Sequence, residues 1–394
     1  MESPITIIDE AQALYEMVVG FRRHLHRNPE LSFHEYETAR FIADVLRSEG
    51  VECRPVAGTG VLARIVGERG DPASAVVLRA DMDALPVCEA TGLPFASERE
   101  GVMHACGHDM HVAALMGAMI LLNRQRAQID GTVFGLFQPG EELSPGGATM
   151  VLAENPFEGY IVRAFFGQHV EPELPTGVLG IRAGEYMAST DELRFTVHGV
   201  GGHGAMRHNL RDSVEAAAAL VLELLRVGNT SRTDGGPESV LSIGRVIADG
   251  ATNIVPDNVF LEGTLRTFDE RLRAEIKRRI AELCLSLSRD YGVEITPDIR
   301  DGFPSVVNSA VLAGAARRVF SDAFGPAAVV ELGRRMTGED FGYYTRRYPA
   351  LFYRFGVSGF GASRAVGKLH SPIFNPDERS LVFAVAGLVM LTRT

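Results

Sequence analysis

The 394-residue sequence lacks the features that mark secreted and membrane-spanning proteins. Its most apolar stretch, Leu381–Leu391, is much shorter than the roughly 20 residues that a membrane-spanning helix needs. The first residues have neither the basic start nor the apolar core of a secretory signal peptide. We therefore expect a cytoplasmic protein with no membrane partner.

Cysteine is scarce, and its spacing is informative. The four cysteines form no CxxC pair, which excludes a zinc ribbon, a thioredoxin motif and a disulfide framework; they are Cys53, Cys88, Cys106 and Cys284. In a reducing cytoplasm a cysteine beside a histidine is more readily a metal ligand or a catalyst than half of a disulfide. Cys106 has such a neighbour.

An excess of positive charge is also missing. The net charge is −11, and Lys and Arg are scattered along the chain, so we expect no nucleic-acid partner. There is no G-x-S-x-G sequence, which argues against a serine hydrolase. The glycine-rich stretch Gly199–Gly204 lacks the Lys-Ser/Thr of a P-loop and precedes no suitable strand-to-helix turn.

The length predicts two domains, because single hydrophobic cores stop growing at roughly 250–300 residues. In the first half, apolar strand-like runs alternate with helical spacing, which predicts a mostly parallel sheet covered on both faces. The expected helices are Asp9–Arg27, Tyr36–Ser48, Met110–Asn123 and Ala148–Glu154, and the expected strands are Val61–Val66, Ala75–Ala80, Thr132–Gln138 and Arg163–Val170.

The rhythm changes near Asp191, where the elements follow the order βαββαβ of a ferredoxin-like unit. The α/β pattern then resumes with helix Ala310–Phe324, strand Ala350–Phe355 and a C-terminal helix. We expect a discontinuous three-layer α/β/α domain over residues 1–187 and 298–394, with an inserted domain over residues 188–297.

The segment from His104 to Asp109 is the strongest chemical signal. Cys106 and His108 lie two apart, a spacing that suits a loop entering a helix near Asp109 and wrapping a metal ion. A buried cysteine beside a capping histidine is the structural alternative. His104 and His111 mimic helical spacing with His108, and of the three we expect only His108 to be a ligand.

Carboxylates follow two of the predicted strands. Glu141 and Glu142 come after an apolar strand and a Pro-Gly turn, so one can bind metal while the other acts as a base. Asp81 and Asp83 end the preceding strand and fit equally as ligands or as partners of metal-bound imidazoles. They could also be simple turn formers before Pro86.

These motifs resemble the dinuclear-metal amidohydrolases and peptidases that include hippurate hydrolase, N-acyl-amino-acid deacylases and plant indole-acetyl-amino-acid hydrolases. The resemblance runs nearly end to end. Its motifs are Arg23–His26 with Asn28–Leu31, Arg79–Pro86, His104–Asp109, Gln138–Glu142, Gln168-His169, Gly201–His203, Thr252-Asn253 with Pro256-Asp257, Gly338–Phe341 and Leu369–Pro372.

The resemblance implies roles for individual residues. The implied metal ligands are Cys106, His108, Glu142, His169 and His370. Glu141 is implied as general base, with Asp83 as a supporting carboxylate. The inserted domain resembles a lid and dimerisation domain whose His203 reaches the partner subunit's active site. Asn253 and Arg266 are implied to contact substrate.

One departure is visible in the loop around His203. Relatives usually carry Ala after this histidine and Pro before the next one, where this chain has Gly204 and Arg207. His203 itself is retained, but the shape of the loop, and with it the substrate preference, is open.

We therefore expect an enzyme that hydrolyses N-acyl amino acids with two divalent ions per subunit, of manganese, zinc, nickel or cobalt. A dipeptidase or carboxypeptidase on the same scaffold is the alternative, and a non-catalytic metal- or ligand-binding relative is less favoured. The expected assembly is a homodimer or a higher homo-oligomer. Contacts of Asp81, His104, His111 and Glu339 with the site are left open.

Overall fold

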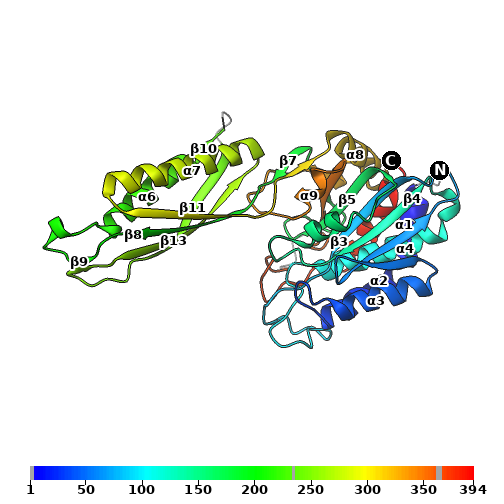
Figure 1. Ribbon diagram of the computed structural model, residues 1–394. Coiled ribbons are helices and arrows are strands. Elements are labelled where there is room, and N and C mark those ends of the chain that lie inside the picture. The colour runs from blue at the N-terminus through cyan, green and yellow to red at the C-terminus, as the bar shows by residue number, and fades with distance from the viewer. Residues whose placement is uncertain (1–3, 233–235, 361–365) are drawn as a thin grey trace. The chain divides into compact units, whose positions relative to one another are not determined.

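The computed structural model describes residues 4–232, 236–360 and 366–394. The chain divides into two compact units (Figure 1). Unit 1 comprises the chain up to Gly184 together with Val307–Gly333 and Tyr343–Thr394, and unit 2 comprises Glu185–Val306 and Arg334–Gly342. The small domain expected over 188–297 lies within unit 2, which also includes the flanking residues and the separate segment 334–342.

Unit 1 is built on an eight-stranded mixed sheet. β3, β4, β5 and β17 are joined by parallel pairing, whereas β1 pairs with β2, β2 with β4, and β17 with β6 in antiparallel fashion. The spatial order is β1 (Glu52–Val56), β2 (Gly60–Val66), β4 (Thr132–Gln138), β3 (Ser74–Asp81), β5 (Ile161–Glu171), β17 (Ala350–Gly356), β6 (Leu179–Ile181) and β16 (Val329–Glu331).

Helices cover both faces of this sheet, as the alternation of side chains along a strand requires. On β5, Ala164 and Phe166 belong to the core shared with α4 and α10, while Phe165 stacks on Tyr344 of α9. The helices are α1 (Pro4–Ala13), α2 (Tyr15–Arg27), α3 (Tyr36–Ser48), α4 (His108–Arg124), α5 (Gly147–Glu154), α8 (Ala310–Phe324), α9 (Gly342–Thr345) and α10 (Ser380–Leu391). The three-layer α/β/α architecture is confirmed.

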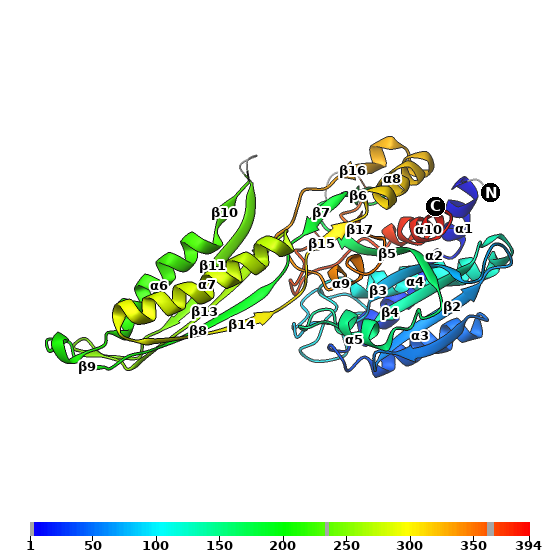
Figure 2. The ribbon, with the colours of Figure 1, turned by 45° about the horizontal axis from the view of Figure 1, so that its top comes forward.

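Unit 2 has a five-stranded antiparallel sheet in the order β10-β11-β13-β8-β14. Alternate residues of β8, such as Leu193 and Phe195, are buried in the core beneath α6 and α7, which lie side by side on one face (Figure 2). The elements are β8 (Asp191–His198), α6 (Ser213–Gly228), β10 (Thr230–Ser231), β11 (Pro237–Ile247), β13 (Asn258–Thr267), α7 (Glu270–Tyr291) and β14 (Glu294–Asp301). Apart from the two-residue strand β10, this is the βαββαβ order that the sequence predicts.

The short strands are where the sequence prediction fails. β1 is mostly solvent-facing and contains Pro55, so it has no apolar alternation to detect, and β6 and β16 have three residues each. The short strands β7 (Gly184–Met187), β10 and β15 (Val306–Asn308) were also unpredicted. The single helix expected over Asp9–Arg27 is divided at Leu14, whose backbone is still right-handed helical.

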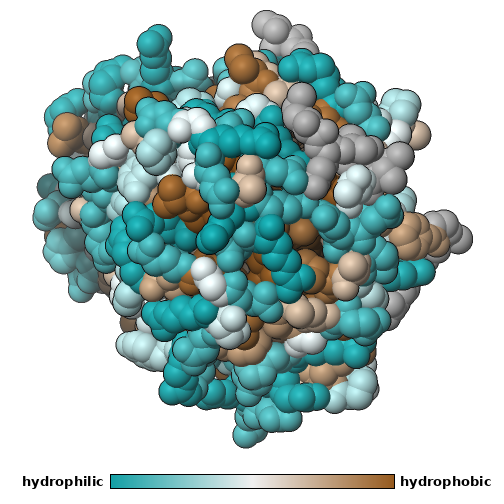
Figure 3. Space-filling view, turned by 90° about the vertical axis from the view of Figure 1, so that its right-hand side faces the viewer, coloured by the Kyte–Doolittle hydropathy of each residue, from teal (hydrophilic) through white to brown (hydrophobic). Residues whose placement is uncertain are grey.

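The surface view shows small hydrophobic patches separated by hydrophilic side chains on the face that is drawn (Figure 3). Among the described residues, no helix is both long and apolar enough to cross a membrane.

Candidate active site

The carboxyl ends of three parallel strands of unit 1 bring the predicted polar residues together. β4, β3 and β5 are neighbours in the sheet and run in the same direction. Asp81 ends β3, Glu141 and Glu142 follow β4, and His169 lies near the end of β5. Open α/β sheets bind their ligands at such an edge.

The loop before α4 supplies two more donors. Gly107 lies between Cys106 and His108 with φ +84°, a left-handed conformation that favours glycine. A Cβ atom at this position would approach Cγ2 of Val170 to 2.8 Å. The absence of a side chain therefore allows this loop to pack tightly against β5.

We expect Gly107→Ala to lower the free energy of unfolding by about 1–3 kcal/mol more than Gly159→Ala, because overpacking is added to backbone strain. The two glycines have the same φ of +84°, but a Cβ at Gly159 would meet nothing within 4 Å. Urea denaturation of both variants measures the difference. Equal destabilisation would show that contact with Val170 is unimportant.

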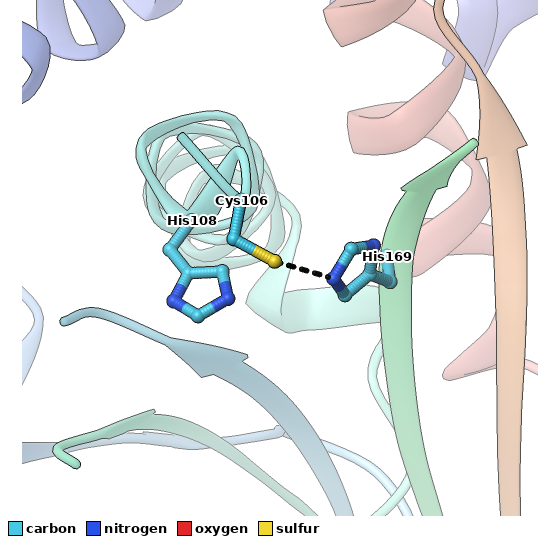
Figure 4. A group of neighbouring side chains, drawn as sticks. All are labelled: Cys106, His108 and His169. Carbon is cyan, nitrogen blue, oxygen red and sulfur yellow. Dashed lines mark hydrogen bonds between the residues drawn. The ribbon is translucent and has the colours of Figure 1, made fainter. Parts of the chain in front are cut away.

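Six predicted residues form overlapping clusters of potential metal donors. Cys106, His108 and His169 form one three-donor group, and Cys106, Glu142 and His370 form a second, each with donor atoms within 4.8 Å of one another. Figure 4 shows the first group, in which Sγ of Cys106 lies 3.4 Å from Nε2 of His169. A third group joins His108 and Glu142 to the buried Glu141.

Backbone carbonyls fix the orientation of two of these imidazole rings. Nδ1 of His108 donates to the carbonyl of Asp83 at 2.9 Å, and Nδ1 of His169 donates to the carbonyl of Val170 at 2.8 Å. In the neutral form of each ring, Nε2 then carries the lone pair that a metal ion needs. Nε2 of His108 and Oε1 of Glu142 are buried without a hydrogen-bond partner in the part of the chain that the structure describes.

Asp83 and Asp81 play different structural parts. Oδ2 of Asp83 accepts hydrogen bonds from Ser32 Oγ at 2.7 Å and from the backbone N–H of Glu142 at 2.9 Å. Asp83 thus ties His108 to Glu142. Asp81 instead pairs with Arg79 at 2.7 Å and with Nδ1 of His111 at 2.6 Å.

His111 is saturated by these contacts, because its Nε2 accepts the backbone N–H of Val170 at 2.9 Å. No lone pair is left for a metal, which supports the prediction that His108, rather than His111, is a ligand. His104 is buried, and burial lowers its pKa to about 4. Neither of its ring nitrogens has a hydrogen-bond partner among the described residues.

Burial and neighbouring charges shift the pKa values of several residues in this cluster. Burial raises the pKa of the Cys106 thiol well above its usual range. Burial also raises the pKa of Glu142, against the opposing charges of His108 and His370. Burial alone would lower the pKa of His108, but Asp81 and Cys106 outweigh it and hold that pKa above its ordinary value. A divalent cation would satisfy this set of S, N and O donors.

His370 enters the site from the loop before α10. Its φ is +63°, which is uncommon for a residue with a side chain, and its backbone N–H donates to the carbonyl of Ala105 at 2.9 Å. This bond fixes His370 beside the Cys106 loop. Uncommon backbone conformations of this kind cluster at functional sites.

Unit 2 contains the other predicted site residues. His203 on β9 (Gly202–His203) pairs with Ile254 on β12 (Ile254–Val255), and the N–H of Gly204 donates to the carbonyl of Asn253 at 2.8 Å. Nδ1 of His203 accepts the N–H of Ala205 at 3.2 Å, so Nε2 carries the ring proton of the neutral imidazole. Glu339 is also in unit 2, where its carboxylate accepts the N–H of Phe341.

Arg266 lies far from His203 within unit 2. It is half-buried, and burial lowers its pKa. Arg266 comes eight residues after Asn258 on β13, a span of about 27 Å in an extended strand. β9 and β12 lie beyond the Asn258 end, and Figure 1 shows β9 and β10 at opposite ends of this unit. His203 and Asn253 are therefore neighbours, and Arg266 is separate from both.

Comparison with known proteins agrees with this geometry. Residues 77–393 match the model of peptidase family M20/M25/M40. The chain belongs to this family.

Relatives in the M20 family have been named for their activities. The chain is 37% identical over 373 residues to N-acetyl-L-cysteine deacetylase of Bacillus subtilis, covering 94% of this chain and 86% of that protein. It is 36% identical to N-acetyldiaminopimelate deacetylase of Exiguobacterium sibiricum, covering 94% and 97%. A solved Bacillus subtilis structure described as a dinuclear metal binding peptidase from the M20 family has 34% identity and a TM-score of 0.83, covering 97% and 98%.

The sequence motifs include Arg79 and Gln138, but the supporting role of these residues in the M20 site was not predicted. Arg79 is almost fully buried and bonds both Asp81 and Gln138, whose Oε1 also accepts from Tyr344. A charged residue inside an apolar strand was the available signal, because an arginine is rarely buried without a partner.

Proposed function

We propose that this chain is a metal-dependent amidohydrolase that cleaves the amide bond of N-acyl amino acids. The observation that carries the proposal is the pair of three-donor groups that share Cys106 and lie beside Glu141. The names of the deacetylase relatives support an amide of an amino acid as substrate.

Cys106, His108 and His169 would hold one ion, and Cys106, Glu142 and His370 the other. When bound there, two divalent ions would supply Lewis-acid chemistry, polarising the amide carbonyl and lowering the pKa of water. Asp83 orients His108 and the backbone of Glu142. A thiolate, imidazoles and a carboxylate suit zinc, manganese, cobalt or nickel.

Glu141 acts as the general base. It is buried, and it lies in the same donor group as His108 and Glu142, which places its carboxylate beside the proposed ions. Glu141 accepts the proton of the attacking water and then returns it to the leaving amine. A binding protein without catalysis has no need of this carboxylate, which argues against the non-catalytic alternative.

His203 donates from Nε2 to the oxyanion that develops on the substrate carbonyl, and Asn253 assists in binding. Arg266 anchors the free carboxylate of the amino acid, since a planar guanidinium matches that group. Because Arg266 and His203 lie at opposite ends of unit 2, one small substrate can meet both only if they come from different chains. This separation supports a homodimer with shared sites.

An exposed apolar stripe on α6 gives independent support for a second copy. Val214, Leu222 and Leu225 are 40%, 59% and 36% exposed, and they lie with the exposed Ala218 at helical spacing. Such a stripe is typical of a surface that is covered in an assembly. We also propose a cytoplasmic location, in which Cys106 stays reduced.

We expect chelation to abolish hydrolysis of N-acyl amino acids and re-addition of one divalent metal to restore it. Activity is measured on N-acetyl- and N-benzoyl-amino acids, with metal content followed by elemental analysis. Full activity in metal-free protein would overturn the proposed function. Steady-state kinetics on dipeptides, measured in the same assay, distinguishes a dipeptidase from a hydrolase of N-acyl amino acids.

A further inference from the structure

The N-terminal motif around Arg23–His26 and Asn28–Leu31 has no part in the proposed reaction, yet the structure connects it to the site. Asp109, the residue after His108, is fully buried at the start of α4. Its Oδ2 accepts from Nε of Arg22 at 2.8 Å and from Nδ1 of His26 at 2.9 Å. Arg22 and His26 are one helical turn apart, so they share a face of α2.

His26 connects Asp109 to a second carboxylate, that of Glu89. Nε2 of His26 lies 3.2 Å from the carboxylate of Glu89, which also accepts the N–H of Ser97. Both ring nitrogens of His26 thus face carboxylates and can donate only if the ring is protonated. Burial alone would lower the pKa of His26, but Asp109 and Glu89 hold it above its ordinary value. Asp109 thus accepts from Arg22 and His26 at once, and His26 also faces Glu89.

The residues after α2 hold the other side of His108. The backbone N–H of Ala84 donates to the carbonyl of Glu30 at 2.8 Å, and Leu31 forms a β-bridge with Ala84. Ser32 donates to Asp83, whose carbonyl receives the Nδ1 proton of His108. The segment Arg22–Ser32 therefore reaches His108 in two ways, through Asp83, which receives the proton of its ring, and through Asp109, the next residue in the chain.

We propose that Arg22–Ser32 is a positioning segment for the metal centre, and that Asp109 is the positioning residue through which α2 sets the place of Cys106 and His108. Buried charges cost free energy unless they are paired, so Asp109 is confined to one location by Arg22 and His26. Cys106 and His108, which are close to Asp109 in the chain, are thereby held in place as well. This inference rests on the metal centre proposed above.

The test compares metal binding by Asp109→Asn and by Glu378→Gln. Glu378 also accepts from Arg22, at 3.1 Å, but lies at the edge of the cluster and does not contact Asp109. Competition with a chelator gives the Co²⁺ affinity, and the visible spectrum of the Co²⁺-loaded protein reports thiolate coordination by Cys106. We expect Asp109→Asn to weaken metal binding by about 10- to 100-fold and to alter the spectrum. Glu378→Gln should leave both near wild type.

A loss of folding is separated from a loss of positioning by a second variant. Arg22→Gln combined with Asp109→Asn leaves no uncompensated charge between the two positions, and its metal-free thermal unfolding is compared with that of the wild type. We expect a folded double variant with the same weakened Co²⁺ binding. Wild-type affinity and spectrum in either Asp109 variant, or an equal loss in Glu378→Gln, would overturn the inference. A wild-type protein that binds no Co²⁺ would instead overturn the proposed function.

Discussion

Glu141→Gln is expected to lower kcat by about 10²- to 10⁴-fold while the bound metal content stays at the wild-type level. The substitution keeps the volume of the side chain but removes the basic oxygen. In the proposed site Glu141 takes a proton from water, whereas the ions are held by other residues. Elemental analysis of the purified variant and steady-state kinetics on an N-acyl amino acid measure both quantities.

Glu142→Gln is the matched control, because it makes the same change one residue along the chain. Glu142 belongs to the group with Cys106 and His370, and its Oε1 lies 3.8 Å from Nε2 of His108 and 3.5 Å from Nε2 of His370. We expect this variant to lose metal as well as activity. If Glu141→Gln released the metal and Glu142→Gln retained it, the two roles would be reversed.

Much of this site can be predicted from sequence because its donors lie in short local motifs. Cys106 and His108 flank one glycine, and Glu141 and Glu142 follow one apolar strand. The parallel order of β4, β3 and β5 then brings separate strand ends to one edge. Local pattern and sheet topology together account for the clustering of the carboxylates with His169.

The supporting contacts could not be predicted, because they join residues that are far apart in the chain. Asp109 meets Arg22 across 87 residues and His26 across 83. The spacing of the histidines along the sequence also fails to show which of His108 and His111 is a metal ligand. Only the three-dimensional structure shows that Asp81 and the backbone of Val170 occupy both ring nitrogens of His111. In unit 2, the separation of Arg266 from His203 depends on the length and direction of β13.

Mixed dimers of His203→Ala and Glu141→Ala are expected to recover activity that neither variant has alone. In each mixed dimer one site combines the intact Glu141 of the first chain with the intact His203 of the second. The other site lacks both groups. Equal mixing with full subunit exchange should therefore restore about a quarter of the wild-type turnover, since half of the dimers are mixed and each has one complete site.

The physical reason lies in unit 2, where the Nε2–H of His203 and the guanidinium of Arg266 are too far apart to contact one small substrate of the same chain. Loss of an oxyanion donor alone costs about 10²- to 10³-fold in kcat, so recovery is easily seen above the background of the parent variants. His208→Ala, five residues further along the same exposed loop, is the matched control and should be active by itself. Confirmed mixed dimers with no gain in turnover would mean that His203 serves its own chain, and the shared site would have to be abandoned.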